Sequence, residues 1–252
     1  MISEFPLFMF TTLGGLAAGA YATSAVFPPS KSSGRQWLFP LVCLVLLAVG
    51  VAFLPLHLGR PERMLQALTQ PGAMIAQEAY WGGALGILVL VDVVVSKVKG
   101  SSPRALRVVG AIAALGLTVV MANAYYVSLG VAAWASWQTF ALYVVGDFAM
   151  GAALLAVFDR GLVDNASYMI TAIVLAALGA LAIVLEAVHF AGVGADFILL
   201  AVGAAVVLVG AIVAFLMKAG KVDSKVGAIV VFACLFIGVA FARYGFYAAY
   251  VA

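Results

Sequence analysis

Eight long apolar stretches run along the chain, separated by short breaks rich in glycine, proline or charged residues. They cover about residues 5–27, 37–57, 75–96, 105–128, 137–158, 166–190, 196–217 and 226–250. Each has the length of about 20 residues that an α-helix needs to cross a bilayer. Because lipid offers no partner to backbone polar groups, helices are the expected structure. The pattern predicts an all-α polytopic integral membrane protein, a bundle of eight transmembrane helices forming one membrane domain over residues 1–252.

Composition agrees with this prediction and excludes other classes. The chain is 66% hydrophobic and 9% charged, with a mean hydropathy of +1.21, whereas soluble domains carry about 25% charged residues. A net charge of +3 is too small to indicate nucleic-acid binding. The two cysteines, Cys43 and Cys234, lie in apolar stretches and are too few for an iron–sulfur cluster. No Lys or Arg precedes the first stretch, so we expect a retained helix rather than a secretory signal.

Lys and Arg residues are distributed very unevenly between the two sides of the predicted bundle. Ten of the 13 lie in or beside the connections after the first, third, fifth and seventh helices. Arg60 and Arg63 are on the other side, and Arg243 lies inside the last helix. Because positive residues favour the cytoplasmic side, we expect both termini on the periplasmic side of a bacterial inner membrane.

Polar residues within the apolar stretches gather near the expected periplasmic ends, where they form a candidate site. These residues are His57, Glu78, Asn123, Glu186, His189, Arg243, Tyr244 and Tyr247. Ionisable groups at membrane depth commonly mark a ligand or ion pathway, and we expect Glu78 and Arg243 to compensate each other. Asp92 and Asp147 break the pattern, and for Asp147 a structural hydrogen bond and a proton relay remain equal alternatives.

Two further features concern packing. The polar groups at helix ends could instead simply reach the lipid headgroups, and we expect Tyr125, Tyr126 and Tyr250 to belong to an aromatic belt at the membrane surface. Gly15 and Gly19 have the spacing that allows two transmembrane helices to approach closely.

Three segments resemble a known family of membrane anchors. LPLHLGRPERMLQAL at Leu54–Leu68, QEAYWGG at Gln77–Gly83 and ARYGFYAAY at Ala242–Tyr250 are similar to the DmsC family, the membrane-anchor subunit of dimethyl-sulfoxide-reductase-type complexes. The NrfD/polysulfide-reductase anchor is a more distant resemblance. The family implies a membrane anchor that oxidises menaquinol in anaerobic respiration. It also implies no haem in the anchor, and iron–sulfur clusters and molybdopterin only in partner subunits on the outer face.

The resemblance also implies roles for particular residues. His57 and Glu78 match the family's quinol-site histidine and acid, so we expect them to accept the quinol protons. Arg243 or Arg60 would hydrogen-bond a quinone oxygen. The aromatic residues Tyr80, Trp81 and Tyr247 would pack against the headgroup, which completes the expected menaquinol/menaquinone site. Because we expect no metal ligands in this chain, the electrons would leave to an extrinsic iron–sulfur subunit.

Three alternatives remain open. A single b-type haem could be held by His57 and His189, the only two histidines. A transporter or channel is a second possibility, although such proteins often carry inverted repeats and broken helices at the midplane, which we do not find. A purely structural anchor without a quinone site is the third, and it predicts that Glu78 and His57 matter only for assembly.

Overall fold

A computed structural model describes residues 4–29, 36–57, 66 and 68–250. Within these residues, eight helical spans are long and apolar enough to cross a membrane. Seven are single helices: α1 (Phe5–Val26), α2 (Leu38–His57), α4 (Met74–Lys99), α5 (Arg104–Tyr126), α8 (Ala166–Gly192), α9 (Ile198–Lys218) and α10 (Ser224–Ala248). The fifth span joins α6 (Trp137–Phe140), the π-helical turn η3 (Ala141–Val145) and α7 (Gly146–Phe158), and the short turn η4 (Arg160–Asp164) follows it. The predicted all-α fold with eight spans is confirmed.

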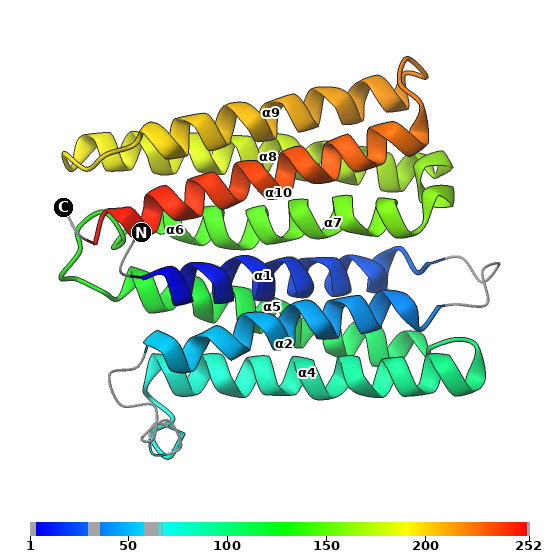
Figure 1. Cartoon of the computed structure of the whole chain (residues 1–252), viewed down its shortest axis with the longest axis horizontal. Coiled ribbons are helices and arrows are strands. Elements are labelled where there is room, and N and C mark those ends of the chain that lie inside the picture. Colours follow the sequence, from blue (N-terminus) through cyan, green and yellow to red (C-terminus); the bar gives the residue numbers. More distant parts are fainter. Residues whose placement is uncertain (1–3, 30–35, 58–65, 67, 251–252) are drawn as a thin grey trace.

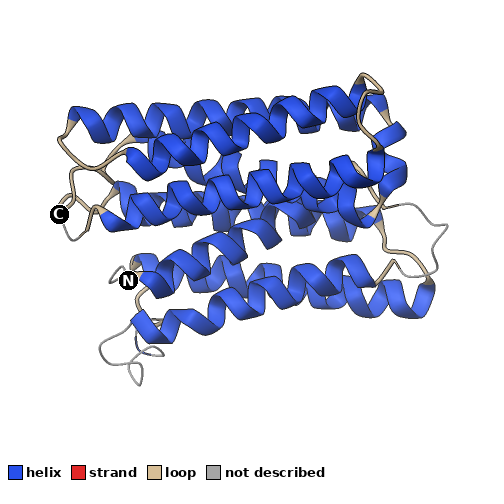
Figure 2. Cartoon of the chain, turned by 45° about the horizontal axis from the view of Figure 1, so that its top comes forward, coloured by secondary structure: helices blue, strands red, loops and turns tan. Residues whose placement is uncertain are grey.

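Successive spans run antiparallel along one common axis, and both ends of the chain lie at the same end of the bundle (Figures 1 and 2). The first four spans pack on one another, with α1 against α2 and α5 and with α4 against α2 and α5. The last four spans form a second group in which α10 packs on α7 and α9. The contact between α1 and α7 joins the two groups, which places α1 at the centre of the molecule.

Small residues make the central contact between α1 and α7 possible. A Cβ atom added to Gly19 would overlap the backbone carbonyl of Asp147, and one added to Gly151 would overlap the backbone of Ala20. Gly15 faces the carboxylate of Asp147 in the same way. The close approach predicted from the spacing of Gly15 and Gly19 is therefore confirmed, and α7 is the partner helix.

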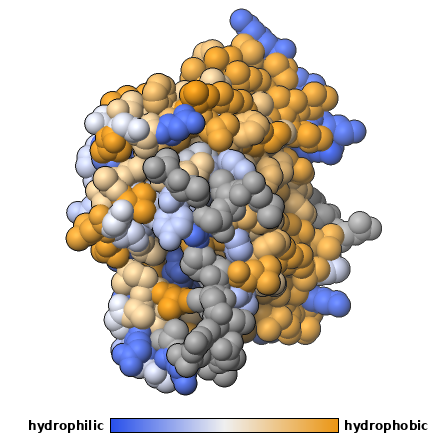
Figure 3. Space-filling view, turned by 60° about the vertical axis from the view of Figure 1, so that its left-hand side comes forward, coloured by the Kyte–Doolittle hydropathy of each residue, from blue (hydrophilic) through white to orange (hydrophobic). Residues whose placement is uncertain are grey.

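The outer surface follows the expected division between lipid-facing sides and polar ends. Large apolar side chains such as Ile87, Ile112 and Phe215 are exposed along the sides, and Figure 3 shows this apolar surface beside a more polar end that holds both termini. At the opposite end, Lys97 and Lys99 occupy the last turn of α4, and Lys218 is in the last turn of α9. The sides of the bundle therefore suit hydrocarbon.

Arg107 does not belong to the inner connections, to which the charge pattern assigns it. Arg107 lies inside α5 and is buried, and its Nε is 3.2 Å from Asp92 Oδ2. Tyr21 donates to the same carboxylate oxygen at 3.0 Å, and Ser96 donates to the other one at 2.7 Å. This cluster accounts for Asp92 as a structural group that ties α1, α4 and α5 together.

Candidate functional site

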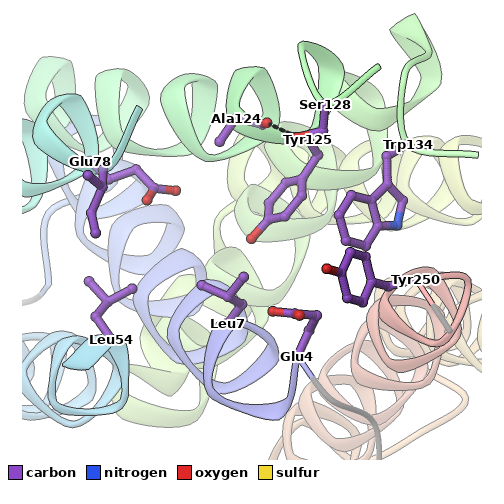
Figure 4. A pocket seen from close by; sticks show the side chains of 10 residues that line it. Glu4, Leu7, Leu54, Glu78, Ala124, Tyr125, Ser128, Trp134 and Tyr250 are labelled. Atoms are coloured by element: carbon purple, nitrogen blue, oxygen red, sulfur yellow. Dashed lines mark hydrogen bonds between the residues drawn. The ribbon is translucent and has the colours of Figure 1, made fainter. Parts of the chain in front are cut away.

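A cavity of about 310 Å³ opens at the end of the bundle that holds both termini. We call it the end cavity. Its lining combines two carboxylates and two tyrosines with apolar and small residues: Glu4, Leu7, Leu54, Ile75, Glu78, Ala124, Tyr125, Ser128, Trp134 and Tyr250. They come from α1 and the residue before it, from α2, α4 and α5, from the connection before α6, and from the segment after α10 (Figure 4). The cavity has the size and mixed character of a small-molecule site.

Glu78 is the most informative residue of the end cavity. It lies in the second turn of α4, is only 7% exposed, and extends its carboxylate into the cavity (Figure 4). Among the residues that the structure describes, none donates a hydrogen bond to this carboxylate or pairs with it. A buried carboxylate without a partner is unfavourable. Its position therefore indicates a ligand that donates a hydrogen bond or a proton.

A chain of tyrosine hydroxyls leads from the protein interior to the cavity wall. Tyr143 donates to Tyr247 at 2.9 Å, and Tyr247 donates to Tyr125 at 2.6 Å. The Thr11 hydroxyl lies 3.1 Å from that of Tyr247. Because Tyr125 accepts from Tyr247, its own hydroxyl proton remains for a group in the cavity. Tyr125 and Glu78 thus offer one hydrogen-bond donor and one acceptor to the same space.

The assignment of Tyr125 to an aromatic belt is wrong. Its side chain is 5% exposed and its ring packs edge-on against Trp134, Phe246 and Tyr247. Tyr126 and Tyr250, at 43% and 53% exposed, do reach the surface as expected. The difference arises because neighbouring residues of a helix point in directions about 100° apart, so only one of two adjacent tyrosines faces the core.

Trp134, which the sequence did not single out, closes one side of the end cavity. The connection between α5 and α6 folds back onto the bundle, and Trp134 Nε1 donates to the Phe246 carbonyl at 2.7 Å. Its ring lies nearly parallel to those of Phe246 and Tyr250, with interplanar angles of 11° and 13°. A tryptophan in a short connection between two spans was the available signal for this wall.

Arg243 does not compensate Glu78, and that expectation is wrong. Its Nη2 lies 2.5 Å from Asp147 Oδ1, its Nη1 donates to the Thr11 carbonyl, and its guanidinium stands 4.5 Å from the centre of the Tyr143 ring. Arg243 is fully buried and lies behind the cavity wall rather than in it. Of the two interpretations of Asp147, the ion pair supports the structural one.

The remaining predicted residues are dispersed. Tyr247 reaches the end cavity only through Tyr125, as the hydroxyl chain shows. Tyr80 is exposed and its hydroxyl donates to the Leu68 carbonyl. The Trp81 ring covers Gly116 of α5, where a Cβ would overlap it. Neither Tyr80 nor Trp81 lines the end cavity.

Two predicted site residues fall where the structure gives no side-chain position. His57 is the last residue of α2, and its side chain lies outside the described part of the chain. Arg60 lies outside the described residues altogether, as does Arg63. Their roles therefore stay predictions.

Glu186 forms a separate cluster rather than joining Glu78. It is buried in α8 and accepts hydrogen bonds from Thr139 at 3.1 Å and from Ser136 at 3.4 Å. His189, one turn further on, has its Nε2 at 3.2 Å from the Ala132 carbonyl. These contacts fasten the connection before α6 to α8.

A second cavity, of about 330 Å³, lies between α2 and α4. We call it the side groove. Its described lining is apolar except for Glu78 at one end. Glu78 and the neighbouring Leu54 belong to the lining of both cavities. Its α4 wall is formed by residues with little or no side chain, Gly82, Gly83 and Gly86. Glu78 therefore stands between the two cavities and contributes to the wall of each.

The sequence matches no protein-family model and no curated protein. In the described part of the chain, no three His, Cys, Asp or Glu side chains lie close enough to hold a metal ion. The feature that points to a function is the end cavity, which combines a buried carboxylate, a tyrosine hydroxyl proton and aromatic walls.

Proposed function

We propose that this chain is the membrane-anchor and quinol-oxidising subunit of a bacterial molybdopterin oxidoreductase of anaerobic respiration. The observation that carries the proposal is the end cavity itself, in which Glu78 and Tyr125 face one space between membrane-spanning helices. A menaquinol headgroup carries two hydroxyl groups on an apolar bicyclic ring. A cavity with one acceptor, one donor and aromatic walls is complementary to such a ring.

Oxidation of menaquinol releases two electrons and two protons, and the protein must receive both. Glu78 accepts the proton of the hydroxyl group nearest to it, because its carboxylate has no competing partner among the described residues. Tyr125 donates to the other ring oxygen and is held in place by Tyr247. His57, at the end of the neighbouring helix α2, is the proposed second proton acceptor.

The electrons leave to an iron–sulfur subunit outside the membrane, which passes them to a molybdopterin catalytic subunit. Arg60 and Arg63 lie in the connection between α2 and α4, next to the end cavity in sequence, and are the proposed docking cations. The lysines at the opposite end of the bundle favour a cytoplasmic location for that end. The end cavity and both termini then face the periplasm of the bacterial inner membrane.

The decisive experiment measures electron delivery from menaquinol to the partner iron–sulfur clusters in the intact complex, purified from native membranes. Glu78→Gln keeps the size of the side chain but removes the carboxylate, so we expect delivery to fall by a factor of about 100 or more. Asp164→Asn is the control, because it makes the same change from carboxylate to amide at an exposed position outside the end cavity. We expect it to retain wild-type delivery at equal assembly.

The result also separates the alternatives. Unchanged delivery in Glu78→Gln would reduce this chain to a structural anchor or move the quinol site elsewhere. A haem absorption spectrum in the purified chain would support the b-type alternative. If no extrinsic subunit co-purifies, the transporter interpretation returns.

A further inference from the structure

We infer that the side groove holds the isoprenoid tail of the quinol, and that the quinol reaches Glu78 sideways from the bilayer between α2 and α4. This inference rests on the proposed function, because it assigns the tail of the molecule whose ring occupies the end cavity. Its basis is that the two cavities are adjacent, with Glu78 and Leu54 in the lining of both.

The side groove is complementary to an apolar chain in shape and in chemistry. Phe10 forms part of its lining, Leu47 and Val51 of α2 form one wall, and Gly83 and Gly86 of α4 form the other. From Glu78 to Gly86 is eight residues, which is about 12 Å along the helix. Among the described residues of the lining, only Glu78 is ionisable, and it lies at the end where the ring would be attached.

The groove is open towards lipid because α4 lacks side chains there. A Cβ atom added to Gly83 would meet nothing within 4 Å, and one added to Gly86 would meet only Leu47 Cδ2 at 3.7 Å. Gly83, Ala48 and Val51 are all exposed on the side of the bundle that suits hydrocarbon. A tail in the groove can therefore continue directly into the bilayer.

Charge distinguishes a quinol tail from the acyl chain of a phospholipid. An acyl chain in the groove would bring an anionic phosphate towards Glu78, which lines both cavities. No Lys or Arg is found among the described residues that line either cavity. The uncharged hydroxyl groups of a quinol donate hydrogen bonds to carboxylates instead, so the site favours a neutral amphipathic ligand.

The test compares a naphthoquinol that carries a four-isoprene tail with menadiol, which has the same ring and no tail, both kept reduced under anaerobic conditions. Binding to the full chain in lipid nanodiscs is followed by quenching of tryptophan fluorescence, which Trp134 in the cavity wall should report. Gly83→Leu and Gly86→Leu place a side chain in the groove. Ala84→Leu adds similar bulk to an exposed position of α4 that lies outside the groove lining, and is the control.

We expect Gly83→Leu and Gly86→Leu to weaken binding of the tailed quinol about tenfold, through lost burial of a few methylene groups. These two variants should bind menadiol within a factor of two of wild type, and Ala84→Leu should bind both ligands as wild type does. If the tailed quinol binds the groove variants as it binds wild type, or if both groove variants lose both ligands equally, the inference is overturned. Competition of the tailed quinol by phosphatidylglycerol would also overturn it.

This design separates the inference from the proposed function. Tight menadiol binding that is lost in Glu78→Gln supports the quinol site whatever the groove variants do. If wild type binds neither quinol, both the site and the tail assignment fail.

Discussion

The buried ion pair between Asp147 and Arg243 gives the sharpest quantitative prediction of the structure. Both side chains are fully buried, and their charged atoms are 2.5 Å apart. Asp147→Asn keeps the shape of the side chain and removes its charge. The Arg243 guanidinium would then be left in the membrane interior with neutral partners alone among the described residues: the amide oxygen of the new side chain, the Thr11 carbonyl and the face of the Tyr143 ring.

The expected magnitude follows from the environment. Removing one member of a buried ion pair costs about 3–5 kcal/mol, because the other charge remains buried without compensation. Helices dispersed in a micelle retain partial partners for their polar groups, which lowers measured values for membrane proteins. We therefore expect Asp147→Asn to lower the free energy of unfolding by about 3 kcal/mol. The double variant Asp147→Asn/Arg243→Gln, in which neither charge remains, should be more stable than either single variant.

Unfolding can be followed by the reactivity of the Cys43 thiol. Cys43 is 1% exposed in the folded chain, whereas Cys234 is partly exposed. In a Cys234→Ala background, a thiol-reactive fluorogenic dye therefore reports the exposure of Cys43 during unfolding by heat or by sodium dodecyl sulfate. Asp164→Asn, at an exposed position, is the control and should stay within about 0.5 kcal/mol of wild type.

Two results would refute the reasoning. Asp147→Asn could prove as stable as Asp164→Asn, which would mean that the pair contributes no net stability. Alternatively, the decrease in the free energy of unfolding of the double variant could equal the sum of the decreases in the two single variants, which would mean that the two charges are not energetically coupled. Either outcome would return Asp147 to the alternative of a proton relay.

Three further substitutions test the packing of the bundle with the same dye assay. Gly19→Ala should lower stability by about 1–3 kcal/mol, because its Cβ would overlap the backbone of α7, whereas Gly83→Ala points into open space and should be neutral. Tyr21→Phe removes a donor to a buried carboxylate at 3.0 Å and should cost about 1.5–3 kcal/mol. Thr139→Val removes the 3.1 Å hydrogen bond to Glu186 and should cost about 1–3 kcal/mol, and a wild-type transition would contradict the role given to this bond.

The spans could be predicted from the sequence because the membrane imposes a simple rule. A bilayer requires about 20 apolar residues per crossing, and the predicted ends lie within about three residues of those of helices such as α4 and α8. The closeness of α1 to another helix was also visible in the spacing of Gly15 and Gly19. The identity of that helix was not, since many spans of this chain are rich in glycine and alanine.

The pairing of ionisable groups could not be predicted from the sequence. The position of a residue along a helix fixes the membrane depth of its charged atoms only when the side chain is short. Arg243 and Glu78 both lie near the same end of the bundle, which suggested a pair. A guanidinium, however, lies several bonds from its backbone, and Arg243 reaches inward to Asp147. That partner is 96 residues away in the sequence. The rotation of a helix about its own axis is also not fixed by its sequence. The sequence therefore does not distinguish Tyr125 from the adjacent Tyr126, although only Tyr125 lines the cavity.

Helix α1 connects the structural core to the candidate site. Its Gly15 leaves room for the Asp147 carboxylate, its Thr11 contacts both Arg243 and Tyr247, and its Leu7 lines the end cavity. Arg243 of α10 therefore ties α1 to α7, because it binds both the Thr11 carbonyl and the Asp147 carboxylate. Thr11 in turn contacts Tyr247, whose hydroxyl orients Tyr125. On this basis Asp147→Asn should affect the donor side of the cavity as well as stability, although Asp147 does not line the cavity. Glu78, held by α4, should keep its position, so the two halves of the candidate site can be perturbed separately.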